Sequence, residues 1–555
     1  MWKKNDLTVV TIEDLTRDGE GIGHAEGYTL FVKDGLPGDV VRARITRPKK
    51  MYAYARVETV LVPSPDRVEA RCPHARRCGG CLLQEYDYPA QLRWKENYVR
   101  SALERIGGFD GLPVRPVIGM SNPFRYRNKA QYPVGMSRDS DGQTRLSAGF
   151  YAARTHSLIA VDDCVITGEV NQSVVREFLA FMEQYHIAPY DEKTHTGIVR
   201  HLLIREGRSS GQILVCPIVN AGRMPHAEEL ISCLRKIPGV CSISVNYNTV
   251  PGNTIMGRKT ETLYGNGWIE DTIGSLTFRI SPRSFFQVNP VQTEKLYGAA
   301  VEAAGLTGKE TVYDLYCGIG TISLFAAQHA KTVYGVEIVA DAIRDAKENA
   351  ARNGIRNAFF FEGAAEKLVA AGEFEPGVPC PHADVVILDP PRKGCAPELI
   401  EAVRRMEPGR IVYVSCDPAT LARDLRRFRE GDGTVYIPEY VQPVDMFPQT
   451  CHIETVCLLS KLSEAKNHIS VKVDMDEMDV TAAKSKATYQ EIQAWVQEKY
   501  RFHVTHLNIA KTKRKCGIIE RVNYNLPKSE NSRSPETPKE KEEAIIEAFR
   551  HFQMI

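Results

Sequence analysis

Three apolar stretches in the second half of the sequence end on residues that can do chemistry. The first reaches Asp314 before a glycine turn, the second reaches Asp389 before two prolines, and the third reaches Cys416. Open α/β sheets bind their ligands at the carboxyl ends of their strands. If the three stretches are neighbouring strands, the sequence predicts two carboxylates and a thiol at one edge of a sheet. Without these neighbouring motifs, a lone cysteine would be read as a small buried apolar residue.

The elements that must position these residues alternate between strand and helix from Ser284 onward. Gly318 and Gly320 allow a sharp turn and the close approach of a ligand before a helix begins. The next predicted strand ends on Glu337, at a spacing from Asp314 that suits contact with a ribose hydroxyl. We predict a Rossmann-like α/β domain over residues 284–462. Together with the Asp-Pro-Pro sequence, the pattern favours S-adenosylmethionine over NAD as its ligand.

A cysteine cluster precedes this domain. Cys72, Cys78 and Cys81 lie within ten residues, and Cys164 could supply a fourth ligand. Four thiolates suit either a 4Fe–4S cluster or a structural zinc ion. The spacing differs from that of radical S-adenosylmethionine enzymes. β-type and helical runs alternate over the following residues, so we predict an α+β central domain over residues 63–283.

Short alternating segments separated by glycine turns occupy residues 1–62. Such strands predict a small, closed, OB-like β-barrel, a fold that binds nucleic acid on one face. The basic run at residues 47–50 lies beside Tyr52 and Tyr54, which pairs positive charge with rings on which bases can stack. A structural barrel with a solvated loop is the alternative. This region resembles the TRAM domain, a small RNA-binding barrel.

A basic strip follows the cysteine cluster. In an extended chain Arg125, Arg127 and Lys129 share one face. This strip could hold an RNA backbone, and a solvated strand face is the alternative.

The residues after the α/β domain, 463–555, read as a small helical appendage. A predicted helix from residue 488 and a second segment over residues 504–515, which ends in a basic run, resemble a helix-turn-helix nucleic-acid module. An appendage with a solvated charge run is the alternative. Residues 526–543 read as a linker.

Composition limits the class of protein. A chain of 555 residues predicts several domains. The net charge of +2 gives no global attraction to nucleic acid, so RNA binding would need local basic patches. No stretch reads as a transmembrane span or a signal peptide, and fourteen cysteines then indicate thiols, metal ligation or catalysis. We expect a cytoplasmic protein without a membrane partner.

Taken together, the motifs resemble those of bacterial RNA uracil-C5-methyltransferases, which make 5-methyluridine in ribosomal RNA. The resemblance covers residues 5 to about 461 and rests on five ordered motifs. These are Phe285-Phe286-Gln287-Val288-Asn289, residues 314–320, residues 389–394, Ser415-Cys416-Asp417-Pro418 with the six residues that follow, and His452-Ile453-Glu454-Thr455-Val456.

The resemblance implies roles for particular residues. It implies that S-adenosylmethionine binds through Gln287, Tyr316, Glu337 and Asp389. It implies that Cys416 is the nucleophile and Glu454 the base. It also favours a 4Fe–4S cluster over zinc for Cys72, Cys78, Cys81 and Cys164.

The chemistry of uracil agrees with these roles. C5 of uracil is a poor nucleophile, and addition of a thiolate to C6 turns it into an electron-rich enolate carbon. An ordinary cysteine is only a few per cent thiolate near neutral pH, so we expect Cys416 to lie where its thiolate is favoured. After methyl transfer C5 still carries its proton, which Glu454 is placed to remove. A base that meets both groups must leave its stack.

The substrate is the least determined part of this interpretation. The barrel and cysteine cluster resemble the ribosomal branch, so 23S rRNA is favoured over transfer RNA. Arg392 stands where related cytosine-C5 enzymes carry a cysteine, which argues against cytosine. An RNA-binding or RNA-remodelling protein with an incidental methyltransferase fold is the competing hypothesis, and Cys416 and Glu454 count against it. No obligate protein partner is evident.

Overall fold

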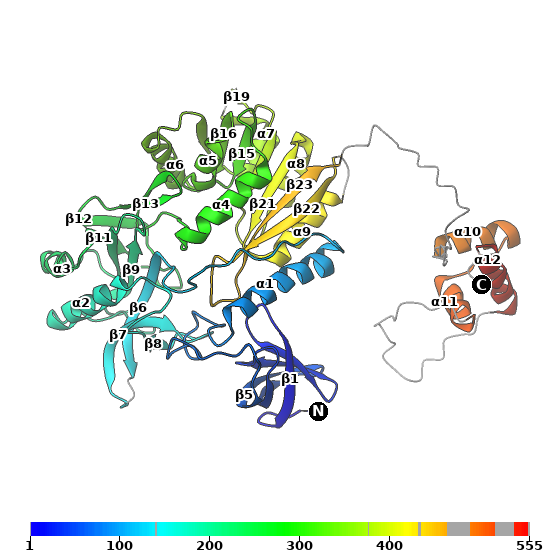
Figure 1. Cartoon of the computed structure of the whole chain (residues 1–555), viewed down its shortest axis with the longest axis horizontal. Coiled ribbons are helices and arrows are strands. Elements are labelled where there is room, and N and C mark those ends of the chain that lie inside the picture. The colour runs from blue at the N-terminus through cyan, green and yellow to red at the C-terminus, as the bar shows by residue number, and fades with distance from the viewer. Residues whose placement is uncertain are drawn as a thin grey trace. The chain divides into compact units, whose positions relative to one another are not determined.

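The structure is a computed structural model that describes residues 2–138, 141–375, 377–430, 434–462, 489–516 and 538–552. The chain divides into two units, residues 1–464 and 465–555, and each is described by itself (Figure 1). The domain boundaries predicted within the first unit stay predictions.

The first unit begins with a closed five-stranded barrel, drawn in dark blue in Figure 1. Its strands are β1 (Leu7–Leu15), β2 (Gly21–Ala25), β3 (Tyr28–Lys33), β4 (Val40–Pro48) and β5 (Tyr52–Val62), which pair in the order β1-β2-β3-β5-β4. Alternate side chains such as Val10, Ile12 and Val41 fill the interior. The predicted OB-like barrel is confirmed.

A helix, α1 (Tyr88–Ala102), follows the cysteine-rich loop and continues into a π-helical turn over Leu103–Gly107. Its buried face carries apolar residues such as Val99 but also the polar residues Gln91 and Lys95. Buried polar side chains need hydrogen-bond partners, so this face must meet polar groups elsewhere in the unit.

The central region is a seven-stranded sheet with the order β12-β11-β10-β9-β6-β7-β8. Its strands are β6 (Lys129–Arg138), β7 (Thr144–Tyr151), β8 (Leu158–Ala160), β9 (Val199–Glu206), β10 (Ile213–Val219), β11 (Val240–Tyr247) and β12 (Lys259–Tyr264). Two helices, α2 (Val170–Gln184) and α3 (Ala227–Leu234), pack on it through a shared apolar core. A hairpin of β13 (Ile269–Ile273) and β14 (Leu276–Ile280) follows. The predicted α+β architecture is confirmed.

The last part of the first unit is a second seven-stranded sheet with helices on both faces. Its strands are β15 (Thr311–Leu315), β16 (Thr332–Glu337), β17 (Ala358–Glu362), β20 (Val385–Leu388), β21 (Arg410–Ser415), β22 (Tyr436–Val444) and β23 (Glu454–Lys461). Its helices are α4 (Pro290–Ala304), α5 (Thr321–Ala327), α6 (Ala340–Arg352), α7 (Ala365–Ala371), α8 (Pro397–Met406) and α9 (Pro418–Arg429), and β18 (Glu373–Glu375) pairs with β19 (Val378–Pro379) beside it.

The strand order of this sheet is β17-β16-β15-β20-β21-β23-β22. The first five strands are parallel, whereas β23 runs antiparallel to β21 and to β22. Apolar clusters lie on both faces, one with α4, α5 and α6 and the other with α8 and α9. The carboxyl ends of β15, β20 and β21 therefore lie side by side at one edge, which confirms the predicted Rossmann-like domain.

The second unit contains three described helices, α10 (Tyr489–Tyr500), α11 (His506–Lys515) and α12 (Lys539–His551), around a small apolar core. The two predicted helices are confirmed in their described residues. The linker prediction is wrong at its end, because α12 begins at Lys539, and residues 526–537 lie outside the described residues. Within the basic run Lys513 is buried and Lys515 pairs with Glu542 at 2.8 Å. A role in binding nucleic acid stays a prediction.

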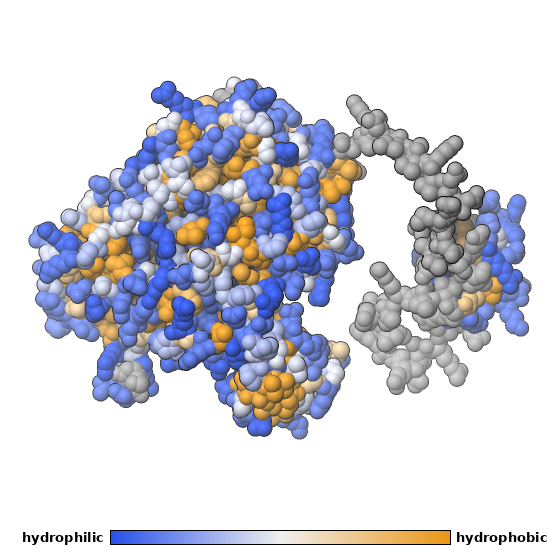
Figure 2. Space-filling model, viewed as in Figure 1, coloured by the Kyte–Doolittle hydropathy of each residue, from blue (hydrophilic) through white to orange (hydrophobic). Residues whose placement is uncertain are grey.

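Polar side chains cover most of the face drawn in Figure 2, with apolar side chains grouped on the barrel. Exposed apolar residues there include Leu7, Val9 and Leu61. Among the described helices, none combines the length and the apolar character needed to cross a bilayer.

Candidate active site

A cavity of about 740 Å³ opens at the carboxyl edge of the second sheet. This volume is within the range of small-molecule and cofactor sites. All six residues predicted from the sequence to bind the cofactor or to react line it, namely Gln287, Tyr316, Glu337, Asp389, Cys416 and Glu454. Tertiary structure therefore brings together side chains from six separate segments of the chain.

Cys416 occupies the turn between β21 and α9. The backbone N–H groups of Ala419 and Thr420 donate to Oδ1 of Asp417, both at 3.0 Å, so Asp417 caps the helix. Pro418 occupies the first turn, where its missing N–H costs nothing. β21 therefore ends at Ser415, and Cys416 lies at the carboxyl edge of the sheet.

The pairing of β21 with β23 places Glu454 at the same end of the sheet as Cys416. Glu454 is the first residue of β23, which runs antiparallel to β21 with Ser415 opposite Thr455. The next position in this register sets Cys416 opposite Glu454. The carboxyl group is only 5% exposed, which agrees with the prediction of a buried rim residue.

The thiol of Cys416 and the carboxyl group of Glu454 both have a raised pKa. Burial, with the charge of Glu454 next, raises the pKa of Cys416 to about 11, and Arg392 opposes this shift. Burial and then Asp389 raise the pKa of Glu454 well above its ordinary value. The expectation that the thiolate of Cys416 is favoured is therefore wrong for this cavity, because burial penalises the charged thiolate and Glu454 adds to the shift.

The glycine turn and Glu337 form the other end of the cavity. Gly318 and Gly320 both adopt left-handed backbone conformations, with φ of 54° and 83°. The N–H of Gly318 donates to Oε2 of Glu337 at 3.3 Å, and that of Val339 donates to Oε1 at 3.0 Å. The carboxylate is thus fixed at the end of β16, where the sequence predicted contact with a ribose.

Two further carboxylates face this end. Asp314 accepts a hydrogen bond from Ser323 Oγ at 2.6 Å through Oδ2, while its Oδ1 has no hydrogen-bond partner among the described residues. Burial raises the pKa of Asp314 and of Asp389 to about 7. The unpartnered Oδ1 of Asp314 can accept a hydrogen bond from a ligand. Since both carboxyl groups have a pKa near 7, a positively charged ligand would favour their ionised forms.

Gln287 and Tyr316 complete the predicted cofactor set. Gln287 lies just before α4, and its backbone carbonyl accepts from Asn128 Nδ2 at 3.0 Å. Asn289 then caps α4 by accepting from Gln292 N. Tyr316 follows β15 directly and lines the cavity with Gln287.

Several cavity residues were not predicted as site residues. Lys129, Phe285, Arg392, Phe447 and His452 also line the cavity, and the side chain of Phe285 is 69% exposed. Four of them lie in or beside the motifs, so their position in the sequence could have suggested them. Lys129, at the start of β6, was predicted as part of the basic strip, and no sequence pattern links it to this cavity.

The three residues of the predicted basic strip are all partly exposed. Arg125 pairs with Asp163 at 2.6 Å, while Arg127 and Lys129 line a second cavity. Burial, with Arg205 and Arg127, lowers the pKa of Lys129 to about 8. The use of this strip to hold RNA stays a prediction.

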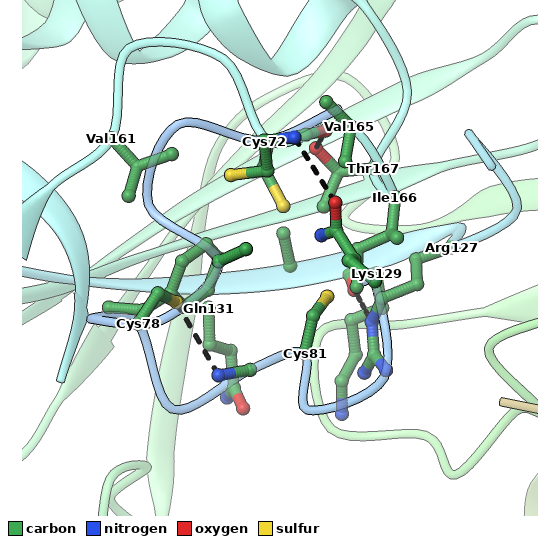
Figure 3. Close-up of a pocket in the computed structure, with 16 residues that line it drawn as sticks. Cys72, Cys78, Cys81, Arg127, Lys129, Gln131, Val161, Val165, Ile166 and Thr167 are labelled. Atoms are coloured by element: carbon green, nitrogen blue, oxygen red, sulfur yellow. Dashed lines mark hydrogen bonds between the residues drawn. The ribbon is translucent and has the colours of Figure 1, made fainter. Parts of the chain in front are cut away.

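This second cavity, of about 280 Å³, is lined by all four predicted metal ligands, Cys72, Cys78, Cys81 and Cys164. Figure 3 shows the side chains of Cys72, Cys78 and Cys81 turned toward the same space. Burial raises the pKa of Cys81 to about 12 and that of Cys78 and Cys164 above the ordinary value. Within the described residues, no group of side chains already has the geometry of an ion-binding site.

The barrel carries an aromatic cluster. The rings of Phe31, Tyr52 and Tyr54 lie with their centroids 5.6–5.8 Å apart. The two tyrosines are those predicted to stack on bases, and the basic run of residues 47–50 leads from the end of β4 to β5, the strand that carries both tyrosines.

Comparisons with known proteins agree with this geometry. Residues 270–462 match the family model described as tRNA (Uracil-5-)-methyltransferase, and residues 7–57 match the TRAM domain. An RNA methyltransferase of Halalkalibacterium halodurans is 50% identical over 457 residues, which is 82% of this chain and 97% of the relative. An RNA methyltransferase of Bacillus cereus is 46% identical over 458 residues, 82% of this chain and 97% of the relative.

A solved structure extends the comparison to the fold. The tRNA (uracil-54, C5)-methyltransferase of Pyrococcus abyssi, in complex with S-adenosyl-L-homocysteine, superposes with a TM-score of 0.64 at 26% identity. The match covers 81% of this chain and 100% of that protein. The chain therefore belongs to the RNA uracil-5-methyltransferase family of S-adenosylmethionine-dependent enzymes, and it carries a TRAM domain.

Proposed function

We propose that the protein methylates C5 of a uridine in ribosomal RNA through a covalent adduct with Cys416. The observation that carries the proposal is that Cys416 and Glu454 line one cavity with Gln287, Tyr316, Glu337 and Asp389. A thiol, a carboxylate and a nucleotide-type site within a single cavity are what methylation at a carbon with little nucleophilic character requires.

Cys416 begins the reaction. Its thiolate forms a bond to C6 of uracil, and the electron pair of the C5–C6 double bond moves onto C5 and the O4 carbonyl. The raised pKa means that Cys416 starts as a thiol, which must first give its proton to the solvent that reaches this partly exposed residue. Arg392 favours the thiolate, and a bound sulphonium cation would favour it further, since an opposite charge lowers the pKa of an acid.

S-adenosylmethionine, which Gln287, Tyr316, Glu337 and Asp389 would hold, would supply the methyl group as a sulphonium. The bond from C5 to the methyl carbon would form as the bond from sulphur to that carbon breaks, with neutral S-adenosylhomocysteine as the leaving group. C5 then carries both the methyl group and its original hydrogen. Glu454, which must enter this step as a carboxylate, accepts this hydrogen as a proton, the C5–C6 double bond forms again, and the bond from C6 to Cys416 breaks. The raised pKa of Glu454 makes its carboxylate a stronger proton acceptor. The thiolate and 5-methyluridine are released.

The target base must leave its stack to reach a thiol at a sheet edge. The exposed ring of Phe285 in the cavity offers a surface on which an unstacked base can lie. The barrel cluster of Phe31, Tyr52 and Tyr54 provides a second stacking surface away from the reaction. We therefore propose that RNA is held at the barrel and opened at the cavity.

We further propose that Cys72, Cys78, Cys81 and Cys164 hold a 4Fe–4S cluster. Four thiols from two distant segments line one mainly apolar cavity, which fits a cluster that thiolates ligate and apolar walls protect. The raised pKa of Cys81 means that this thiol releases its proton only to a strongly bound cation. The cluster would tie residues 72–81 to Cys164, and no step of the methyl transfer uses it.

Transfer RNA is the second candidate substrate, because the solved structure from Pyrococcus abyssi is named for tRNA uracil-54. Ribosomal RNA is our first choice because the barrel together with the cysteine cluster resembles the ribosomal branch. Either substrate places the reaction in the cytoplasm, and every reacting group proposed comes from this one chain.

A trapping experiment tests the proposal. The protein is incubated with S-adenosylmethionine and 5-fluorouridine-containing 23S rRNA or transfer RNA, and covalent complexes are detected on a denaturing gel. Fluorine cannot leave C5 as a proton, so the methylated adduct should persist. We expect a band with ribosomal RNA that needs S-adenosylmethionine and disappears in Cys416→Ala.

The controls separate the alternatives. A band with transfer RNA alone would replace the ribosomal substrate. No band with either RNA, although both bind, would favour an RNA-binding protein with an incidental methyltransferase fold. Cys233→Ala removes a partly buried thiol on α3 that does not line the cavity, and it should leave the band intact.

A further inference from the structure

The loop of residues 445–453 joins β22 to β23 and leads directly into Glu454. Phe447 and His452 on this loop line the reaction cavity. Loops normally run over the surface, where water satisfies their backbone. Here Asp445 and Gln449 are buried, so protein groups must satisfy the loop instead.

Gln449 has a backbone conformation that few residues adopt. Its φ is +68°, in the left-handed region that favours glycine. Such a conformation persists only where the surrounding structure determines it strongly, and it is found often at functional sites. Gln449 lies five residues before Glu454 in the chain, so the contacts that hold Gln449 also fix the segment that enters β23.

Gln91 of α1 holds it from one side. The N–H of Gln449 donates to Oε1 of Gln91 at 3.1 Å, and Nε2 of Gln91 donates back to Oε1 of Gln449 at 3.0 Å. The N–H groups of Leu82 and Leu83, which follow Cys81 in the chain, donate to the carbonyl of Gln449 at 3.0 and 3.1 Å. The amide pair and these two bonds fix both the side chain and the backbone of Gln449.

The same helix face holds the start of the loop. Lys95 Nζ donates to Asp445 Oδ1 at 2.6 Å and to the carbonyl of Phe447 at 3.2 Å, and Tyr88 donates to Asp445 Oδ2 at 2.8 Å. Tyr88, Gln91 and Lys95 are spaced by three and four residues, so they share one side of α1. This polar, buried side of the helix meets the loop and accounts for the polar residues within its core face.

We propose that Gln91 is a positioning residue for Glu454, acting through its amide pair with Gln449. The inference rests on the proposed function, because it needs the adduct of Cys416 and the role of Glu454 as base. Cys416 is carried by β21 and α9, not by the loop. Loss of the amide pair therefore slows removal of the C5 proton, and with it cleavage of the bond from C6 to Cys416, while addition and methyl transfer continue.

The test uses the full chain with Gln91→Leu, which keeps the side-chain volume but removes the amide. RNA with ordinary uridine and S-adenosylmethionine are supplied, and released 5-methyluridine and covalent adduct are measured together. We expect release to slow roughly ten- to hundredfold, since a displacement of about 1 Å can cost this much. The fraction of enzyme held as methylated adduct should rise in the same experiment.

Two further variants keep the test decisive. Gln449→Gly retains a left-handed backbone without the amide and should also accumulate adduct, so it decides the outcome if Gln91→Leu does not fold. Arg93→Ala lies on the same helix but is exposed and pairs with Asp66, and it should behave as wild type. If adduct and product fall together in both Gln91→Leu and Gln449→Gly, the amide pair has only a structural role and the inference is overturned.

The proposed function is checked separately. The wild-type protein should be trapped on 5-fluorouridine RNA, and Glu454→Gln should accumulate adduct on ordinary RNA. Failure of these two controls would refute the proposed chemistry itself, whereas their success with no adduct in Gln91→Leu would refute only the positioning role.

Discussion

The cavity that holds Cys416 and Glu454, called the reaction cavity here, and the cavity lined by Cys72, Cys78, Cys81 and Cys164, called the cysteine cavity, are built in different ways. The reaction cavity is lined mainly by residues at the ends of neighbouring strands of one sheet, such as Asp389 and Cys416. The cysteine cavity is lined by residues that come largely from loops, and Cys164 lies far along the chain from Cys81. Lys129 lines both cavities. A sheet edge sets the spacing of its residues by itself, whereas loops need a further connection to hold theirs.

The two cavities also differ in how readily their acidic groups ionise. Asp314 and Asp389 have a pKa of about 7, so a passing cationic ligand can shift their ionisation. Cys81 has a pKa of about 12, so only a firmly bound metal would keep it ionised. The first cavity suits a ligand that binds and leaves, and the second suits one that stays.

The largest effect is expected from removing the base in the reaction cavity. We expect Glu454→Gln to lower turnover about 10²- to 10⁴-fold, the usual contribution of a general base. Methylated adduct should accumulate on ordinary RNA, because Cys416 still adds and the methyl group is still transferred. Product release and adduct are measured on the same samples, and unchanged turnover would remove Glu454 from the mechanism.

The next effect concerns the cysteine cavity. We expect protein purified without oxygen to contain about four iron atoms per chain, and Cys81→Ser to lose them. Loss of a bound group should lower the melting temperature by roughly 5–15 °C. Cys233→Ser, a cysteine outside the cavity, is the matched control. One zinc ion and no iron in the wild type would overturn the cluster assignment.

The charge difference predicts a pH dependence of cofactor binding. Asp314 and Asp389 must lose protons to face a cation, and their pKa is about 7. The affinity for S-adenosylmethionine should therefore rise as pH increases from 6 to 8, by up to about tenfold per unit below the pKa for each of the two carboxyl groups. Calorimetry at several pH values checks this. Asp389→Asn should flatten the profile, and a flat wild-type profile would contradict the assignment of these carboxylates.

The smallest effect is expected at the barrel. We expect Tyr54→Ala to weaken RNA binding about 5- to 100-fold, as for the loss of one stacked base. The affinity for S-adenosylmethionine should stay the same, because the barrel does not line the cavity. Tyr264→Ala removes an exposed tyrosine of the central sheet as the control. Equal effects of both variants on RNA binding would argue against a specific role for the barrel cluster.

Much of the reaction cavity could be predicted from the sequence because the end of a buried strand is marked by the residues at that point in the chain. Apolar runs that stop at Asp314, Asp389 and Cys416 mark the carboxyl ends of three strands, and parallel strands bring these ends to one edge. The barrel was predictable for a similar reason, since alternation and glycine turns are local signals.

Other features depend on contacts between distant segments. The sequence by itself determined which strands end in reactive side chains and which cysteines could share a ligand. Only the tertiary structure decided that β21 and β23 bring Cys416 and Glu454 to one cavity, that Lys129 lines two cavities, and that the pKa of Cys416 is raised. Register, burial and the balance of surrounding charges come from residues far apart in the chain, so no local pattern encodes them.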